Sequence, residues 1–386
     1  MKFSVPVVAL IAILAVSFVF TSCDKDEDNP AKAENIKTFS KFFGGSEGDV
    51  GHSVQETSDG GFVIAGFTRS YGAGESDVWL IKTDASGNEL WNRTYGGDEF
   101  DLGVSVQETN DGGFVIAGGT ASYGEENLDV LLIKTDDSGN EIWNSTLGGS
   151  GEDMGESVVE TSDDGFVITG RTAGDILLIK TDGSGNELWN KTFVDSVASH
   201  GECVRETRDG GFVIVGWTQS DLRSYVLLIK TDVSGNELWN RTFGGSLADW
   251  GKSVQETSDG GFVITGSSYG DVWLIKTDAS GNELWNRTFG RDGGYSLEKT
   301  SDGGFVIAGA VSDDSGDRDV LLIKTDGSGN ELWNRTFGGS EGDVGHSVQE
   351  TSDGGFVITG VTGSYGAGSA DVWLIKTDAE GNLSPE

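Results

Sequence analysis

One short sequence recurs along this chain, and its recurrence limits the fold more than any other feature. Gly-Phe-Val-Ile, with small variations around it, occurs seven times at spacings of 43 to 52 residues. Its phenylalanines are Phe62, Phe114, Phe166, Phe212, Phe262, Phe305 and Phe356. A repeat of about 40–50 residues that is built from short strands is typical of a β-propeller. The sequence therefore predicts one ring of repeated units in place of several unrelated domains.

Each repeat contains four segments that we expect to be strands. In the first repeat these are residues 53–57, 62–68, 77–83 and 89–95. The first two and the last two are separated by short turns rich in Asp, Asn and Gly, which adopt positive φ at low cost. No segment of the repeats has the pattern of a helix. The predicted fold class is all-β, a seven-bladed β-propeller of four-stranded antiparallel blades.

The ends of the repeat region predict how the ring closes. Six repeats have a tryptophan in the fourth strand: Trp91, Trp143, Trp189, Trp239, Trp285 and Trp333. The seventh repeat stops before its fourth strand, whereas residues 38–45 stand alone before the first repeat. When the Gly-Gly pairs are aligned, Phe39 falls at the position of Trp91. We therefore expect the N-terminal strand to complete the last blade, which removes two exposed sheet edges.

The repeats also resemble a known family. Phe-Gly-Gly-Ser-Glu-Gly-Asp-Val-Gly-His-Ser-Val, followed by Asp-Gly-Gly-Phe-Val-Ile-Ala-Gly-Phe-Thr-Arg-Ser, is similar to the SBBP-type repeats of seven-bladed propellers in secreted and surface bacterial proteins. The resemblance covers residues 36–382 and departs at Gly61-Phe62, where that family often has Asn-Tyr. It implies an extracellular location and supplies no catalytic residues, since a fold does not determine a function.

The N-terminal region predicts export and a lipid anchor. Residues 1–22 contain a short basic start and a 16-residue apolar run, which is typical of a signal peptide. Phe-Thr-Ser before Cys23 resembles a lipobox, although Leu is usual in place of Phe20; an ordinary signal peptide is the alternative. The charged segment 23–35 is predicted to be a tether. We expect a lipoprotein of the outer membrane or cell surface, followed by a propeller over residues 36–386.

The composition of the chain limits the classes of molecule that the protein is expected to bind. The formal net charge is −37, and a protein that binds nucleic acid needs a basic surface, so nucleic acid is not an expected partner. The same charge opposes attraction to anionic lipid, so membrane contact is expected through the anchor alone. If Cys23 carries lipid, Cys203 has no cysteine left to form a disulfide within the chain. We expect a monomer that packing holds together.

Two sets of aspartates recur in the repeats, and both lie where loops enter strands. One set precedes the first strand of a repeat and the other begins the third: Asp49, Asp101, Asp153, Asp249, Asp292 and Asp343, and Asp77, Asp129, Asp175, Asp271, Asp319 and Asp371. In the fourth repeat Ser199 and Tyr225 replace them. In an antiparallel blade both sets belong to one rim. We expect caps on loop backbone N–H groups, with a ring of calcium sites as the alternative.

The remaining candidates are residues that depart from the repeat. The repeated tryptophans are expected in the core, whereas Trp217 and Trp250 break the pattern and are expected to be more exposed. The fourth repeat also contributes His200 and Arg223, which makes these four residues the candidate ligand-binding set. No nucleophile–base–acid pattern stands out, and no cofactor is indicated.

The predicted function is a non-catalytic binding or scaffold module for a glycan or protein. Two alternatives stay open. One is a surface lectin for polysaccharide capture, and the other is an enzyme with a single site near the fourth blade.

Overall fold

The computed structural model describes residues 36–124, 127–193, 198–220, 222–245, 248–312 and 316–384. In these ranges all regular structure is β-strand, and the compact unit begins at Ile36. The predicted signal peptide (1–22) and tether (23–35), with the candidate lipidation site Cys23, lie outside the described residues. No helix within the described ranges is long and apolar enough to cross a membrane.

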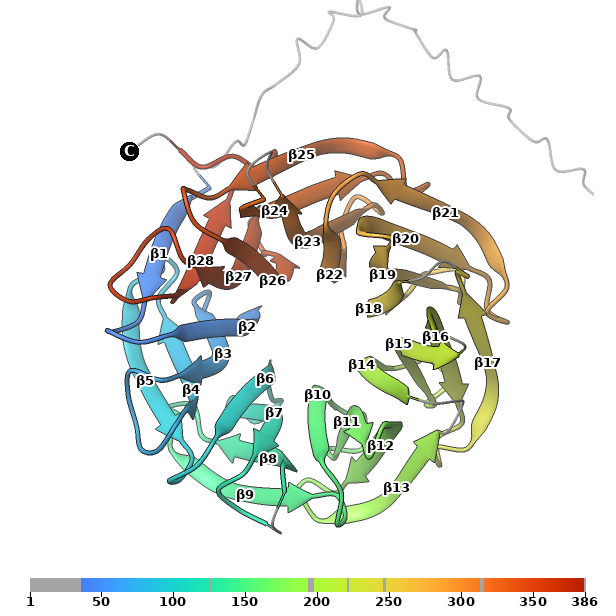
Figure 1. Ribbon diagram of the computed structural model, residues 1–386, viewed down its shortest axis with the longest axis horizontal. Coiled ribbons are helices and arrows are strands. Elements are labelled where there is room, and N and C mark those ends of the chain that lie inside the picture. The colour runs from blue at the N-terminus through green and yellow to red at the C-terminus, as the bar shows by residue number, and fades with distance from the viewer. Residues whose placement is uncertain are drawn as a thin grey trace, which may run out of the picture. The chain divides into compact units, whose positions relative to one another are not determined.

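The strands of the described chain form seven four-stranded antiparallel sheets arranged as blades around a central axis (Figure 1). The innermost strands are β2 (Asp49–Glu56), β6 (Asp101–Glu108), β10 (Asp153–Glu160), β14 (Ala198–Glu206), β18 (Asp249–Glu256), β22 (Gly293–Lys299) and β26 (Asp343–Glu350). The second strands are β3 (Phe62–Thr68), β7 (Phe114–Thr120), β11 (Phe166–Thr172), β15 (Phe212–Ser220), β19 (Phe262–Ser268), β23 (Phe305–Ser312) and β27 (Phe356–Thr362). The third strands are β4 (Asp77–Thr83), β8 (Asp129–Thr135), β12 (Asp175–Thr181), β16 (Arg223–Thr231), β20 (Asp271–Thr277), β24 (Arg318–Thr325) and β28 (Asp371–Thr377). The outermost strands are β5 (Glu89–Tyr95), β9 (Glu141–Leu147), β13 (Glu187–Phe193), β17 (Glu237–Phe243), β21 (Glu283–Phe289), β25 (Glu331–Phe337) and β1 (Phe39–Phe43). The predicted fold class is confirmed.

The predicted closure of the ring is also confirmed. Strand β1 is the outermost strand of the blade that contains β26, β27 and β28, and it pairs antiparallel with β28. The register joins Phe39 to Lys376 and Phe43 to Val372. Phe39 and Phe43 pack against a core cluster that also contains Trp79 of the first blade and Leu374 of the last. The N-terminal strand therefore links the two ends of the chain through backbone pairing and apolar contact (Figure 1).

The apolar core lies between adjacent blades. In one cluster Val63 and Leu80 of the first blade pack against Phe114 and Ile133 of the second, and all four side chains are at most 1% exposed. Trp91 of the outermost strand is only partly buried and covers this cluster from outside, with its ring centroid 6.0 Å from that of Phe114. The same arrangement recurs around the ring, so each blade is stabilised by both of its neighbours.

The innermost strands begin earlier than the sequence predicted, because each contains a β-bulge. Strand β2 starts at Asp49, whereas the predicted strand started at residue 53. The register with β3 shifts between Gly51 and Ser53, and the same shift recurs in all seven innermost strands. The extra residue of a bulge has no partner on the neighbouring strand, which allows its side chain to point elsewhere.

Candidate functional site

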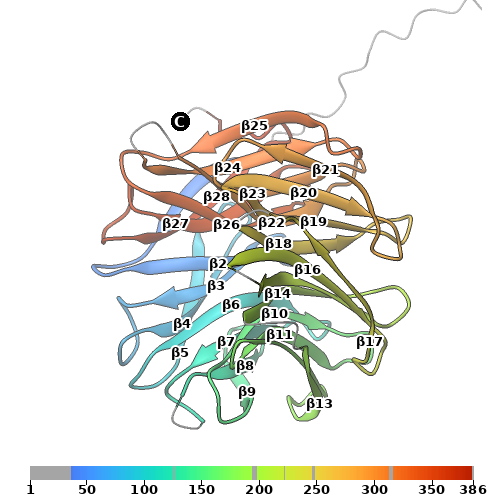
Figure 2. The same cartoon turned by 45° about the vertical axis from the view of Figure 1, so that its right-hand side comes forward.

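The ring has two rims that differ in the segments that form them. We call the edge where the innermost strands begin the loop rim; it carries long connections such as 69–76 and 363–370. The opposite edge, the turn rim, carries tight turns such as 57–61 and 84–88. Between the rims the innermost strands surround the central axis of the ring (Figure 1, Figure 2). Residues of these strands line two cavities, and we call the region along the axis that contains them the central channel.

Because the seven blades are repeats of one sequence, equivalent positions of their innermost strands can be compared with one another. Near the loop rim Gly51 lies so close to the preceding blade that a Cβ atom would be 2.6 Å from Thr359 Oγ1. Two residues later Ser53 Oγ accepts a hydrogen bond from Val106 N of the next blade at 3.2 Å. These two positions are constrained by contacts between blades, which explains why glycine and a small Ser or Cys recur there. The bulged residue between them has neither constraint.

That bulged residue differs from blade to blade. Its identities in chain order are His52, Val104, Glu156, Glu202, Lys252, Tyr295 and His346. All seven side chains line one cavity of about 470 Å³ at the loop rim, which we call the channel mouth. The cavity is also lined by Met154 and Arg318. The repeat thus presents five residue types at one position to a single cavity, whereas the Gly and the Ser or Cys on either side of that position hardly vary.

The charged groups of the channel mouth interact across blades. Lys252 Nζ lies 2.8 Å from Glu202 Oε1, which forms an ion pair between the fifth and fourth blades. Burial, and then repulsion by the Glu202 carboxylate, raise the pKa of Glu156 to about 8. At neutral pH the Glu156 carboxyl group is therefore mostly protonated and can donate a hydrogen bond to a ligand.

Two histidines meet where the last blade joins the first. The rings of His52 and His346 are stacked with centroids 5.1 Å apart. His346 Nδ1 lies 3.0 Å from the carbonyl oxygen of Gly51, which can only accept, so this nitrogen carries the proton. Burial lowers the pKa of both histidines. The pair is therefore neutral at pH 7 and presents an imidazole acceptor to the channel.

A second cavity adjoins the channel mouth and brings together three of the four predicted ligand-binding residues. Trp217 and Trp250 line a cavity of about 500 Å³, together with Gln219, Ser224 and Tyr295; Lys252 lies on the wall that it shares with the channel mouth. His200 stacks on Trp217 with ring centroids 4.4 Å apart. Trp217 Nε1 donates to Glu202 Oε1 at 3.1 Å, and Trp250 is 40% exposed. We call this cavity the tryptophan pocket.

Arg223 lies elsewhere. Its side chain is exposed at the start of β16, and its Nη1 donates to the carbonyl oxygen of Gly245 at 3.0 Å. It lines neither the channel mouth nor the tryptophan pocket. Conversely, sequence reasoning did not single out Glu156, Glu202, Lys252 or Tyr295. The signal that could have found them is the variable residue between the recurring Gly and Ser of the innermost strands.

The recurring aspartates lie at the loop rim and accept hydrogen bonds from the loops. Asp49 accepts from Gly45 N at 2.8 Å and from the hydroxyl groups of Thr68 and Ser70. Asp371 accepts from the N–H groups of Ala367 and Gly368 at 2.9 and 3.1 Å. These contacts are those expected of loop caps.

The two sets of aspartates meet between blades. A Cβ atom on Gly96 would lie 2.4 Å from Asp77 Oδ1 and 2.5 Å from Asp101 Oδ2, so these two carboxylates flank the same glycine. Burial, followed by the charge of Asp101, raises the pKa of Asp77. Among the described residues no group of three or more His, Cys, Asp or Glu side chains could hold a metal ion. Calcium binding at this rim stays a prediction.

Comparison with known proteins identifies the architecture and no family. No family model matches the chain, and no curated protein matches its sequence. Among solved structures it is similar to Sqt1 from Chaetomium thermophilum bound to the N-terminus of the ribosomal protein L10, with a TM-score of 0.52 and 13% identity over 88% of this chain and 98% of that one. It is also similar to YCF48 bound to D1 peptide, with a TM-score of 0.52 and 14% identity over 90% of this chain and 99% of that one. A protein of unknown function from Dyadobacter fermentans has a TM-score of 0.50 and 12% identity, over 87% of this chain and 97% of that one. At these identities the similarity shows the fold alone.

Proposed function

We propose that the protein is a non-catalytic binding module, and that it binds its ligand at the loop rim in the channel mouth and the tryptophan pocket. The export and lipid signals around Cys23 and the resemblance to SBBP-type repeats support a place at the outer membrane or cell surface. The observation that carries the proposal is the variation of the bulged residue. Seven repeated blades place seven side chains in one cavity, and five different residue types occur among them.

A peptide is the ligand class that we favour. The two cavities share Lys252 and Tyr295, so they form one continuous surface that offers an ion pair, aromatic faces and a protonated carboxyl group. Such a mixture suits an extended chain with varied side chains. Two propellers of similar fold have peptides bound, as the Sqt1 and YCF48 complexes record.

A glycan is the second candidate, and the tryptophan pocket favours it. Trp217 and Trp250 come from adjacent blades and line one cavity with Gln219 and Ser224. Aromatic faces bordered by hydrogen-bonding side chains can stack on a sugar ring and bond its hydroxyl groups. This pocket occurs where the repeat is broken, so a lectin of this design has one strong site and not seven equivalent ones.

The deciding experiment screens the full chain against a random peptide library and a glycan array. It is repeated with Trp250→Val and Lys252→His, which introduce residues that the repeat itself uses at Val50, Val344, His52 and His346. We expect the selected ligands to lose at least about tenfold in affinity with either variant, because one buried aromatic or charged contact contributes about 1.5–3 kcal/mol.

The matched control is Leu238→Thr, which changes a side chain that is 57% exposed on the outermost strand β17 and that lines neither cavity. This variant is expected to bind like the original protein. If Trp250→Val and Lys252→His also bind like the original protein, the proposed location of the site is wrong. Binding that is confined to glycans would replace the peptide proposal with the lectin.

A further inference from the structure

At the turn rim the innermost strands are joined to each other by side chains. Val54, Val106, Val158 and Val348 each donate a backbone N–H to a serine Oγ of the preceding blade at 3.2–3.3 Å. One step nearer the rim, the backbone N–H of Glu56, Glu108 and Glu160 donates to a glutamine Oε1 of the preceding blade at 2.6, 2.7 and 2.8 Å. These glutamines are Gln349, Gln55 and Gln107.

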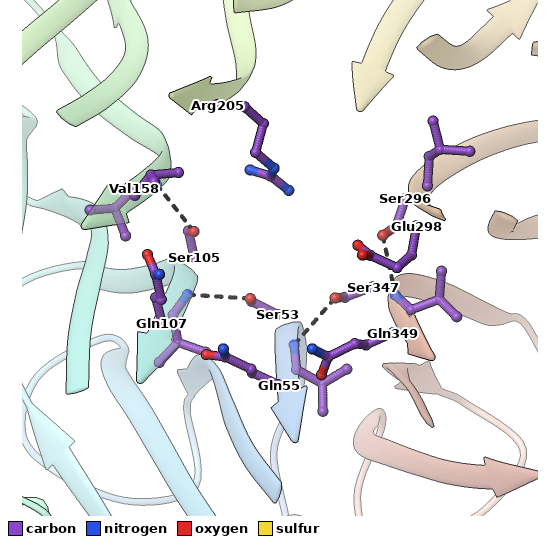
Figure 3. A pocket seen from close by; sticks show the side chains of 15 residues that line it. Ser53, Gln55, Ser105, Gln107, Val158, Arg205, Ser296, Glu298, Ser347 and Gln349 are labelled. Carbon is purple, nitrogen blue, oxygen red and sulfur yellow. Dashed lines mark hydrogen bonds between the residues drawn. The ribbon is translucent and has the colours of Figure 1, made fainter. Parts of the chain in front are cut away.

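These hydrogen bonds determine whether the oxygen or the nitrogen of each glutamine side-chain amide faces the channel. A backbone N–H can only donate, so the amide oxygen must be the atom that meets it, and the assignment of oxygen and nitrogen follows. The Nε2 groups of Gln55, Gln107 and Gln349 donate no hydrogen bond to any described residue. All three line a cavity of about 250 Å³ at this end of the channel (Figure 3). The wall of the cavity is therefore rich in free donors.

The glutamine position is changed in three of the seven blades. Val159, Arg205 and Glu298 replace glutamine in the third, fourth and sixth blades. Figure 3 shows Arg205 pointing into the centre of the cavity, with Glu298 and the glutamines on its other sides. Arg205 Nη1 donates to the carbonyl oxygen of Val204 at 2.8 Å, and the guanidinium group forms no ion pair with any described residue. A cation on a concave polar wall without an anionic partner is available to a ligand.

Glu298 faces the same cavity and is held in place by its neighbour. Gln255 Nε2 donates to Glu298 Oε2 at 3.0 Å, which leaves the other carboxylate oxygen for a ligand. Burial raises the pKa of Glu298 and the charge of Arg205 lowers it, so the two groups interact electrostatically without direct contact. Two opposite charges thus line one small cavity and do not pair with each other.

We propose that this cavity binds a small zwitterion of the size and chemistry of a free amino acid. The ligand carboxylate meets Arg205 and the free amide donors of the glutamines, because a guanidinium and N–H donors together suit a carboxylate. The ligand ammonium group meets Glu298. The site lies at the opposite end of the channel from the channel mouth, and this inference does not depend on the function proposed above.

The surrounding charge supports a zwitterion over a simple anion. Six glutamates follow the glutamine position and bind the neighbouring turns: Glu56, Glu108, Glu160, Glu206, Glu256 and Glu350. Their negative field, in a chain of net charge −37, opposes a ligand that carries only negative charge. A ligand that also carries an ammonium group compensates for this repulsion.

Isothermal titration calorimetry with the full chain tests the proposal. The probes are the common L-amino acids, with propionate and propylamine as analogues that each lack one charge. We expect at least one amino acid to bind, and both analogues to bind at least about tenfold more weakly. Arg205→Gln and Glu298→Gln are each expected to weaken amino-acid binding at least about tenfold. Glutamine is the residue that the repeat uses at this position, so both variants should fold, and thermal melts check this.

Trp250→Val is the matched control, because it changes the loop rim and leaves this cavity intact. It is expected to bind amino acids like the original protein. The proposal is overturned if no amino acid binds at millimolar concentration, if propionate binds as tightly as the best amino acid, or if Arg205→Gln binds like the original protein.

Discussion

A buried lysine is repeated once in every blade, and its partner explains why. Lys82 is only 5% exposed, and its Nζ lies 2.9 Å from Asp59 in the first turn of the same blade. It also donates to the carbonyl oxygen of Thr83 at 3.0 Å. Equivalent pairs occur in the other six blades. The lysine therefore fastens the inner turn to the third strand, which agrees with a structural role and not with a site.

These pairs predict that the fold resists moderate acid and fails in strong acid. Burial would raise the pKa of Asp59, but hydrogen bonds from Thr57, Lys82 and Gly61 and the charge of Lys82 outweigh it and lower the pKa from 3.8 to about 2. A carboxyl group with a depressed folded-state pKa stabilises the fold above its unfolded pKa. The stabilisation is lost as the pH falls through the folded value. We expect the melting temperature to drop mainly between pH 4 and pH 2.

Thermal melts at a series of pH values check this expectation. Asp59→Asn in one blade should cost about 1 kcal/mol at pH 7, since the aspartate is largely exposed while its lysine is left without an anionic partner. The melting temperature of the variant should also fall slightly less between pH 4 and pH 2 than that of the original protein. A melting temperature that stays constant from pH 7 to pH 2 would contradict the role given to these pairs.

At the scale of single residues the sequence predicted part of the site, and the limit has a physical reason. Trp217, Trp250 and His200 were found because each departs visibly from its repeat, and the structure brings them together. Glu156 and Lys252 were missed because a variable residue between the recurring Gly and Ser does not by itself show where its side chain points. Only the bulge, which a linear pattern does not show, directs them into the channel.

At the scale of strands the repeat predicted nearly everything. The turns, the four strands of each blade and the completion of the last blade by β1 are all as expected. The innermost strands were predicted to be too short. The sequence Asp-Val-Gly-His was assigned to a loop, because glycine is common in loops, where its conformational freedom is needed. In the structure that glycine is required by close contact with the neighbouring blade.

The pairing of β1 with β28 makes a direct prediction about stability. Deleting residues 36–43 removes an entire strand and the packing of Phe39 and Phe43 against the last core cluster. It also exposes the backbone edge of β28, which Trp373 and its neighbours now share with β1. We expect a melting temperature lower by 10 °C or more, as an order of magnitude for a loss of several kcal/mol, and a less cooperative transition.

The control deletes residues 24–35 and keeps the strand. Because this segment precedes the compact unit, the control should melt like the original protein. If the deletion of residues 36–43 leaves both the midpoint and the cooperativity of the melting transition unchanged, closure of the ring by β1 is refuted.

At the scale of the whole molecule the ring has one seam, where β1 pairs with β28, and the predicted lipidation site Cys23 precedes the seam strand β1 in sequence. The seam strand begins at Phe39, a short distance after Cys23 in sequence. If Cys23 carries lipid, Cys23→Ser should move the protein from the membrane fraction to the soluble fraction after cell breakage. Equal membrane retention of Cys23→Ser and the original protein would count against the anchor.

The seam also imposes an order on biogenesis. Strand β1 is synthesised before its partner β28, so β1 has no partner strand while the six blades between them emerge. Six blades can form as the chain emerges, but the seventh must wait for the segment that ends at Thr377. A chain truncated before β28 would therefore leave an open arc whose two end strands lack a partner, and such exposed strand edges favour aggregation.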